Sequence, residues 1–265
     1  MTTDNYQRRF GGIQRLYGDR GSEILSQAHF CVVGIGGVGS WAAEALARSG
    51  IDRITLIDFD EICETNINRQ LPALSNTVER KKCQVMAERI ALINEDCQVD
   101  VIDDFLTAQT YEEYLNRGYD YVIDAIDSIK FKSLMINYCK RNKIPLMVTG
   151  GAGGMTDPSQ IQIADVSRTY NDPLIAKVRS QLRKEYGFSS NPKRKFSVDC
   201  VFSSQQAVYP KPDGTVSHEK PGIHGVSLDC RFGYGAASYI TASFGFMAAG
   251  HAINKLIAKG LPKGE

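Results

Sequence analysis

Apolar residues recur in short runs through the first part of the chain, and each run is followed by a longer segment with helical spacing. Runs such as HFCVV and YVID indicate buried strands rather than half-exposed ones. Strands that alternate with helices in this way predict a Rossmann-like α/β fold, with a mainly parallel sheet, right-handed crossovers and flanking helices. The predicted strands lie within 29–37, 53–60, 97–105, 119–127 and 144–154, and the predicted helices cover 40–50, 78–94, 108–118 and 129–143.

The alternation of strands and helices ends after Gly154. The remaining pattern contains a helix with a proline in its first turn, a basic loop rich in turn residues, and several short strands. No internal repeat or low-complexity segment is found. The predicted elements are a strand at 160–166, the helix at 172–187, and strands at 198–203 and 206–210.

We expect one activating-type domain over residues 1–265. Its half 20–155 would bind a nucleotide, and its half 156–265 would complete the sheet and provide the substrate surface. Within the second half, residues 232–254 contain no Lys, Arg, Asp or Glu and are long enough to cross a bilayer. Small residues dominate this run. Although a hydropathy profile could flag it, burial against the sheet or a partner subunit is therefore favoured over membrane insertion.

Composition argues against several classes of protein. The formal net charge is +1 and 43% of the 265 residues are hydrophobic, which is typical of a globular protein without a global field for nucleic acid or membranes. Seven cysteines without a C-x-x-C pair argue against a disulfide framework and a structural zinc site. The N-terminus lacks the apolar segment of a secretory signal, so the expected location is the cytoplasm.

A glycine-rich loop between the first strand and the first helix predicts a nucleotide site. Gly34 permits the tight turn, Gly36 lets the backbone approach phosphates, and Gly39 allows close packing of helix on strand. With Gly37, they precede a helix N-terminus whose free amides stabilise phosphate charge. The loop does not distinguish a nicotinamide dinucleotide from ATP.

Polar residues after the second strand favour ATP. Asp58 can accept hydrogen bonds from ribose hydroxyls in either nucleotide, whereas a second carboxylate, Asp60, has no role in binding a dinucleotide. Asn66 and Arg69 follow in one loop, and the planar guanidinium of Arg69 fits phosphate oxygens. Lys82 begins the next helix, where a cation opposes the helix dipole, so an anion is expected nearby.

Asp127 follows the fourth strand, at the carboxyl edge of the sheet where ligands of open α/β sheets bind. A carboxylate beside a triphosphate is the usual way to hold magnesium. A nucleotidyl transfer needs such a residue together with Arg69 and Lys82, whereas a dehydrogenase needs neither magnesium nor this phosphate-directed charge. The sequence therefore predicts that ATP is consumed with magnesium.

These motifs resemble those of the ubiquitin-activating-enzyme-like superfamily. The segments GIGGVGS, DFD, NINRQ and DAIDS occur in the superfamily's order and spacing over about residues 8–155. The resemblance implies adenylation of a carboxylate by magnesium-ATP and a homodimer. It also implies the roles of individual residues. The four loop glycines cradle ATP, Asp58 holds the ribose, Asn66, Arg69 and Lys82 contact phosphates, and Asp127 positions magnesium.

Further segments extend the resemblance to the bacterial tRNA threonylcarbamoyladenosine dehydratases, over nearly the whole chain. They are RRFGGIQRLYG, CKRNKIPLMVTGGAGG, DPLIAKVR and VDCVFS. The resemblance implies a tRNA that carries threonylcarbamoyladenosine, whose carboxylate is adenylated and then attacked from within the same nucleoside. Superfamily members also take an arginine from the N-terminal segment of the neighbouring subunit. Here Arg15 or Arg9 would supply it.

A basic segment in the second half is a candidate tRNA surface. Between residues 177 and 195 there are seven Lys or Arg residues and one acid, Glu185, which suits a phosphate backbone. Phe188 and Phe196 flank the basic loop and could either stack on bases or anchor the core. The candidate tRNA-binding residues are Arg183, Lys184, Lys193, Arg194 and Lys195.

Two other functions stay open. One is an adenylating activator of a ubiquitin-like sulfur carrier protein, and the other is a non-catalytic partner in a cysteine-desulfurase sulfur relay. The absent zinc cysteines and the basic segment 177–195 count against the first, and the intact Arg69, Lys82 and Asp127 count against the second. Cys200 and Cys230, each after an Asp in a loop-prone region, are the candidate thiols for thioester transfer. Intramolecular ring closure would make such a thiol unnecessary.

Overall fold

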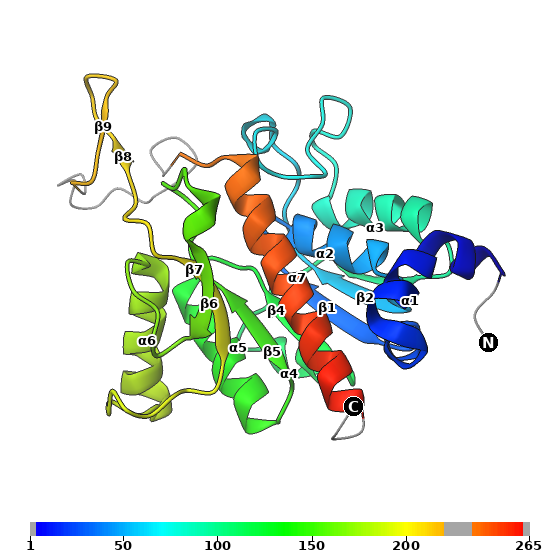
Figure 1. Ribbon diagram of the computed structural model, residues 1–265. Helices are drawn as coiled ribbons and strands as arrows, with labels where there is room; N and C mark the ends of the chain where they lie inside the picture. The colour runs from blue at the N-terminus through cyan, green and yellow to red at the C-terminus, as the bar shows by residue number, and fades with distance from the viewer. Residues whose placement is uncertain (1–3, 220–234, 262–265) are drawn as a thin grey trace.

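The computed structural model describes residues 4–219 and 235–261, and within them a seven-stranded sheet runs through the centre (Figure 1). Its order is β3-β2-β1-β4-β5-β7-β6. All neighbouring strands pair in parallel except β6, which runs antiparallel to β7 at one edge. The strands are β1 His29–Val33, β2 Arg53–Ile57, β3 Gln98–Ile102, β4 Tyr121–Asp124, β5 Leu146–Thr149, β6 Ile161–Asp165 and β7 Asp199–Ser203.

Helices cover both faces of the sheet. Helices α1, α2, α3 and α7 pack over one apolar cluster, and α4, α5 and α6 pack over the other. Figure 1 shows α7 crossing the first face diagonally, beside α2. The predicted Rossmann-like fold is confirmed. The helices are α1 Asp4–Leu25, α2 Gly39–Arg48, α3 Lys82–Ile93, α4 Tyr111–Leu115, α5 Ile129–Arg141, α6 Pro173–Tyr186 and α7 Ser238–Gly260.

Small residues let α7 pack closely against α2. A Cβ on Gly245 would lie 2.5 Å from the carbonyl oxygen of Val38, so only glycine fits between the two helices. The run 232–254 is therefore a buried helix from Ser238 onward, as its composition predicted, and residues 232–234 lie outside the described part. None of the described helices is long and apolar enough to cross a membrane.

Three elements differ from the prediction. Helix α1 was not predicted, and it packs through Tyr6, whose hydroxyl donates to the carbonyl oxygen of Gly50 at 2.7 Å. The helix predicted over 108–118 shortens to α4. The strand predicted over 206–210 is reduced to β8 Tyr209–Pro210, which pairs with β9 Val216–Ser217 in a small hairpin outside the main sheet.

Candidate active site at the carboxyl edge of the sheet

The glycine loop lies where β1 ends and α2 begins. Gly34 has a left-handed backbone (φ 88°), and its N–H donates to the carbonyl oxygen of Ile57 at 2.8 Å. A Cβ on Gly39 would lie 1.8 Å from the carbonyl oxygen of Gly34, which is an impossible contact. The predicted tight turn and the predicted close helix packing are therefore both present in this loop.

The other two glycines lie nearer the solvent. A Cβ on Gly37 would lie 3.3 Å from Cγ2 of Thr241, in the first turn of α7, and 3.5 Å from Cγ of Arg69. A Cβ on Gly36 would meet only Nε2 of Gln70, at 3.9 Å. Phosphate contact by these backbones stays a prediction, but the surrounding space agrees with it.

Asp58 fixes the glycine loop to the end of β2. One carboxylate oxygen accepts the N–H of Ile35 at 2.5 Å, and the other accepts the N–H of Asp60 at 2.8 Å. Burial raises the pKa of the Asp58 carboxyl, and the nearby Lys82 ammonium opposes that rise. Each oxygen keeps a second lone pair, so ribose hydroxyls can still donate to Asp58.

Lys82 is the first residue of α3, at a helix start as expected, although the helix itself was predicted from residue 78, and its side chain is buried. Its Nζ lies 2.7 Å from a carboxylate oxygen of Asp60, whose side chain is 58% exposed. The anion that the sequence required near Lys82 is therefore supplied, in this structure, by Asp60. This ion pair keeps the Lys82 ammonium at the edge of the loop that carries Asp58.

Arg69 stands above the glycine loop, in the segment before α3. Its Nη1 donates to the carbonyl oxygen of Thr65 at 2.5 Å and to the side chain of Asn68 at 3.1 Å, and it forms no ion pair with the described residues. Its own carbonyl oxygen accepts from Trp41 Nε1 at 3.1 Å and from the Thr241 hydroxyl at 3.2 Å. No pattern in the sequence indicated that α2 and α7 would hold Arg69.

Asn66 is buried, and its side-chain oxygen accepts the N–H of Cys63 at 3.1 Å. This bond closes the short 3-10 helix Glu64–Asn66, which precedes Arg69. Asn66 therefore has a structural contact of its own, and its predicted contact with phosphate stays untested.

Asp127 is exposed in the turn between β4 and α5, beside the glycine loop. The preceding residues form the wall of that loop, since a Cβ on Gly34 would lie 2.9 Å from Cγ2 of Ile126. No group of three or more His, Cys, Asp or Glu side chains that could hold a metal occurs within the described ranges. A single carboxylate next to a phosphate loop still fits magnesium, because this ion takes its other ligands from phosphates and water.

A buried ion pair anchors the Asp127 turn. Nζ of Lys132 lies 2.7 Å from Oδ1 of Asp124, and neither side chain is exposed. The same oxygen accepts the N–H of Ile126 at 3.2 Å, while the other oxygen, Oδ2, has no hydrogen-bond partner in the part of the chain that the structure describes. Burial raises the pKa of the Asp124 carboxyl, and Lys132 opposes the rise. The interpretation of Asp124 as structural agrees with this geometry, but the role of Lys132 was not predicted.

The glycines after β5 close the site on its other side. A Cβ on Gly150 would lie 1.9 Å from Oδ2 of Asp172, and the same oxygen accepts the N–H of Gly151 at 3.0 Å. Asp172 also caps α6, because its Oδ1 accepts the N–H of Ile175 at 2.9 Å. A buried carboxylate thus joins the loop after β5 to the C-terminal half.

The prediction that Cys200 is a thiol in a loop is wrong. It is the second residue of β7 and is fully buried, and burial raises its pKa well above the usual value. A buried neutral thiol is a poor nucleophile. Cys230 lies outside the described residues.

Arg15 lies far from this site in its own chain. Helix α1 packs through Tyr6 on Gly50, beyond the C-terminal end of α2, and through Gly21 on Ile257, in the last turn of α7. Helix α7 has 23 residues, so its two ends are about 34 Å apart. Because the first turn of α7 touches the glycine loop, helix α1, which carries Arg15, packs at the end of α7 remote from that loop.

The basic segment folds as the C-terminal part of α6 and the loop that follows it. Asp165 fixes this loop by accepting the N–H groups of Phe196 and Ser197, at 2.9 and 2.6 Å. Phe196 is buried and packs edge-on against Phe188, with ring centroids 4.9 Å apart, so it anchors the core and does not stack on bases. Arg183 is partly buried, with its guanidinium 5.7 Å from the Phe196 ring, and the exposed candidates are Lys184, Lys193, Arg194 and Lys195.

The fold and this edge of the sheet define a nucleotide-binding α/β protein. Comparison with known proteins is more specific: the chain belongs to the ThiF family, whose model matches residues 6–264. It is 58% identical, over 97% of its length and 96% of the relative's, to the tRNA threonylcarbamoyladenosine dehydratase of Haemophilus influenzae. The superfamily resemblance is thereby confirmed.

Two crystal structures of the E. coli tRNA N6-threonylcarbamoyladenosine dehydratase are similar to the whole chain. Both are 50% identical in sequence. The complex with AMP has a TM-score of 0.88 and covers 98% of each chain. The complex with ATP has a TM-score of 0.89 and covers 100% of each.

Proposed function

We infer that this chain catalyses the ATP-dependent dehydration of N6-threonylcarbamoyladenosine in tRNA. The observation that carries this is similarity to the dehydratases over essentially the full length of both chains, including a relative crystallised with ATP. The glycine loop, with positions where only glycine fits, provides the nucleotide site that such a reaction needs.

The chemistry follows in two steps. The threonylcarbamoyl carboxylate attacks the α-phosphorus of ATP, pyrophosphate leaves, and an acyl-adenylate forms. A nucleophilic atom of the same nucleoside then attacks the acyl carbon, AMP leaves with one carboxylate oxygen, and a ring closes with net loss of water. The second step is intramolecular, and its high effective molarity removes the need for an enzyme thiol. The burial of Cys200 agrees with this route.

The roles of the site residues are part of this proposal. Gly34, Gly36, Gly37 and Gly39 cradle the triphosphate while Asp58 accepts from the ribose. Arg69, free of any carboxylate partner in the described structure, and Lys82, held by Asp60, offset charge on the phosphates as the α-phosphorus is attacked. Asn66 shapes the loop that carries Arg69 and contributes to the phosphate site.

Asp127 would hold magnesium, with phosphate oxygens and water as the other ligands. The ion would supply charge neutralisation on the triphosphate. The residues of this chain supply the positioning, because the buried Asp124–Lys132 pair holds the turn in which Asp127 is exposed.

A second copy of the chain would complete the site. Helix α1, which carries Arg15, packs at the end of α7 remote from the glycine loop, which supports contact with a phosphate of a neighbouring subunit over contact within the same chain. We therefore propose a homodimer in which Arg15, or Arg9 in its place, acts on the partner's ATP. Arg9 is the weaker candidate, because it already binds the Ile93 carbonyl oxygen at 3.0 Å and Glu95 at 3.3 Å.

The tRNA would lie along the exposed basic residues at the end of α6 and in the following loop. Lys184, Lys193, Arg194 and Lys195 provide charge for its backbone, and Arg183 lies behind them. A tRNA substrate agrees with the cytoplasmic location that the sequence predicted. A cysteine-desulfurase relay partner stays a prediction, because no described contact addresses it.

The test is mass spectrometry of tRNA nucleosides after incubation with the purified protein, ATP and magnesium. Threonylcarbamoyladenosine should lose one water, and Asp127→Ala should abolish this loss. Asp19→Ala, which removes an exposed carboxylate on α1, should leave it intact. If the nucleosides stay unchanged in tRNA that fully carries threonylcarbamoyladenosine, the proposal is wrong.

The same preparation would then be tested for adenylation of the C-terminal carboxylate of a ubiquitin-like sulfur carrier. Adenylation of the carrier, with no change to tRNA, would establish the alternative function.

A further inference from the structure

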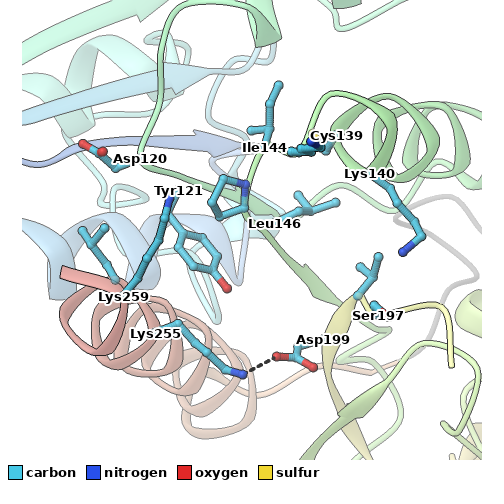
Figure 2. Close-up of a pocket in the computed structure, with 14 residues that line it drawn as sticks. Asp120, Tyr121, Cys139, Lys140, Ile144, Leu146, Ser197, Asp199, Lys255 and Lys259 are labelled. Carbon is cyan, nitrogen blue, oxygen red and sulfur yellow. Dashed lines mark ion pairs between the residues drawn. The ribbon is translucent and has the colours of Figure 1, made fainter. Parts of the chain in front are cut away.

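A pocket of about 370 Å³ lies at the amino edge of the sheet, away from the glycine loop. Its walls are the residues just before β4, β5 and β7, together with the end of α5 and the last turns of α7 (Figure 2). In a parallel sheet the carboxyl ends of all strands share the other edge, so this pocket is separate from the nucleotide site.

Four lysines give the pocket its charge: Lys140 and Lys143 from the end of α5, and Lys255 and Lys259 from α7. Figure 2 shows Lys140 and Lys255 reaching from the two helices toward the segment that enters β7. Within the described part of the chain only Lys255 has an ion pair, with Asp199 at 3.5 Å. The other three are exposed and have no carboxylate partner among residues 4–219 and 235–261.

The two carboxylates of the pocket already have partners. One carboxylate oxygen of Asp199 lies 2.8 Å from His251 Nε2 and 3.5 Å from Lys255 Nζ. Asp120 accepts the backbone N–H of His29 at 2.9 Å. The four lysines outnumber these two carboxylates, so the pocket carries a net positive charge, which favours an anion as its ligand.

Lys143 adopts an uncommon backbone conformation that favours a role for its side chain. It has φ 57°, directly after the last turn of α5, where glycine is usually preferred. A left-handed conformation costs a lysine about 1 kcal/mol relative to glycine. The segment CKRNKIP, which contains Lys140 and Lys143, has no part in the nucleotide site.

The basic loop after α6 leads into this pocket. Ser197 and Val198 line it, and the exposed Lys193–Lys195 precede them in the chain, separated from them by the buried Phe196. One basic region, 183–195, therefore ends two residues before the pocket wall, and the other, 140–143, contributes lysines to the pocket. Exposed lysines on flexible stems, without a fixed guanidinium fork, suit mobile phosphates of a polymer better than one small rigid ligand.

We propose that this amino-edge pocket binds backbone phosphates of the tRNA substrate, an inference that rests on the proposed function. The strands β1 and β2 have five residues each and span about 17 Å. An RNA stem of several base pairs is comparable in length, so one tRNA can contact the lysines while a nucleotide of its loop reaches the carboxyl edge.

The test compares the triple variant Lys140→Gln/Lys143→Gln/Lys259→Gln with the wild-type enzyme in tRNA dehydration and filter binding. KM for tRNA should rise roughly tenfold at about 0.1 M salt, with kcat and KM for ATP unchanged. The slope of log K against log salt should fall by about two to three. The control Arg20→Gln/Arg117→Gln/Lys211→Gln removes three positive charges elsewhere, two of them ion-paired with Glu23 and Glu113, and should behave as wild type.

Four outcomes would overturn the inference. The first three are an unchanged salt slope in the lysine variant, an equal effect in the control, and failure of Lys140→Arg/Lys143→Arg/Lys259→Arg to restore tRNA binding. The fourth is tight binding of inorganic phosphate that disappears in the glutamine variant while tRNA binding is kept, which would mark a small-anion site. If the wild-type enzyme itself leaves tRNA unchanged, the proposed function fails first, independently of the lysines.

Discussion

The two edges of the sheet differ in how firmly their backbone and charged side chains are held. At the carboxyl edge, Gly39 leaves no room for a Cβ, and the Asp124–Lys132 pair is fully buried. At the amino edge, Lys140 and Lys143 are exposed and have no ion pair within the described residues. The first arrangement fixes atoms in place, as a reaction requires, whereas the second provides charge without fixed geometry.

This difference predicts how each edge tolerates change. At the carboxyl edge, a small alteration should damage stability or turnover severely, because backbone and buried charge leave few alternative arrangements. At the amino edge, each lysine should contribute a modest and salt-dependent share of affinity.

The largest effect is expected from Lys132→Met. It leaves the Asp124 carboxylate buried without its cation, and breaking such a pair destabilises proteins by about 3–5 kcal/mol. Urea unfolding of the wild type and the variant would measure the difference. A loss of stability below about 1 kcal/mol would show that the Asp127 turn does not depend on this pair.

The same variant should show a characteristic dependence on pH. Burial raises the pKa of Asp124 in the folded state, and removing Lys132 removes what opposes that rise. The folded variant then binds more protons than the unfolded variant. Its free energy of unfolding therefore falls as pH rises from the ordinary pKa of an aspartate to the raised pKa of Asp124. The gap between variant and wild type should therefore be wider at about pH 8 than at about pH 5. Lys132→Met/Asp124→Asn, which has no buried carboxylate here, should lose this extra dependence.

A smaller effect, on turnover, is expected from Gly39→Ala. The added Cβ would lie 1.8 Å from the Gly34 carbonyl oxygen, so the backbone that faces the phosphates must move. A displacement of about 1 Å at a reacting centre costs on the order of 100-fold in rate. Single-turnover dehydration of tRNA would measure it.

Gly250→Ala is the matched control. This glycine is also helical, in α7, and a Cβ there would meet nothing within 4 Å. The substitution should leave turnover unchanged and stabilise the helix by about 0.5–1 kcal/mol. Equal turnover in the two alanine variants would contradict the steric argument.

The sequence predicted the parts of the carboxyl edge that are local. The order of strands and helices, the glycine loop and the placement of Lys82 at the start of α3 follow from periodicity and short motifs. It did not predict that Trp41 and Thr241 would hold the Arg69 carbonyl oxygen, because these residues come from helices far apart in the chain. Helix α1 was also missed.

The amino edge could not be predicted from sequence for the same reason. Lys143 and Lys259 are far apart in the chain, and only the crossing of α7 over the sheet brings them to one pocket. A charge run such as 193–195 is visible in a sequence, but a charge cluster assembled from two helices is not. Cys200 lies in the strand predicted over 198–203, so that strand already argued against a loop thiol, and its pairing with distant β5 and β6 completes the burial.

The smallest effect is expected from the single substitution Lys143→Gln. Removal of one charge that faces a phosphate should weaken tRNA binding only a few-fold and lower the salt slope by about one. Filter binding between about 50 and 200 mM salt would measure both quantities. Lys143→Gly separates the side chain from the backbone, because glycine adopts φ 57° without strain. It should be more stable than Lys143→Gln and equally weak for tRNA. Tight tRNA binding by Lys143→Gly would mean that the lysine serves the turn after α5 and not the RNA.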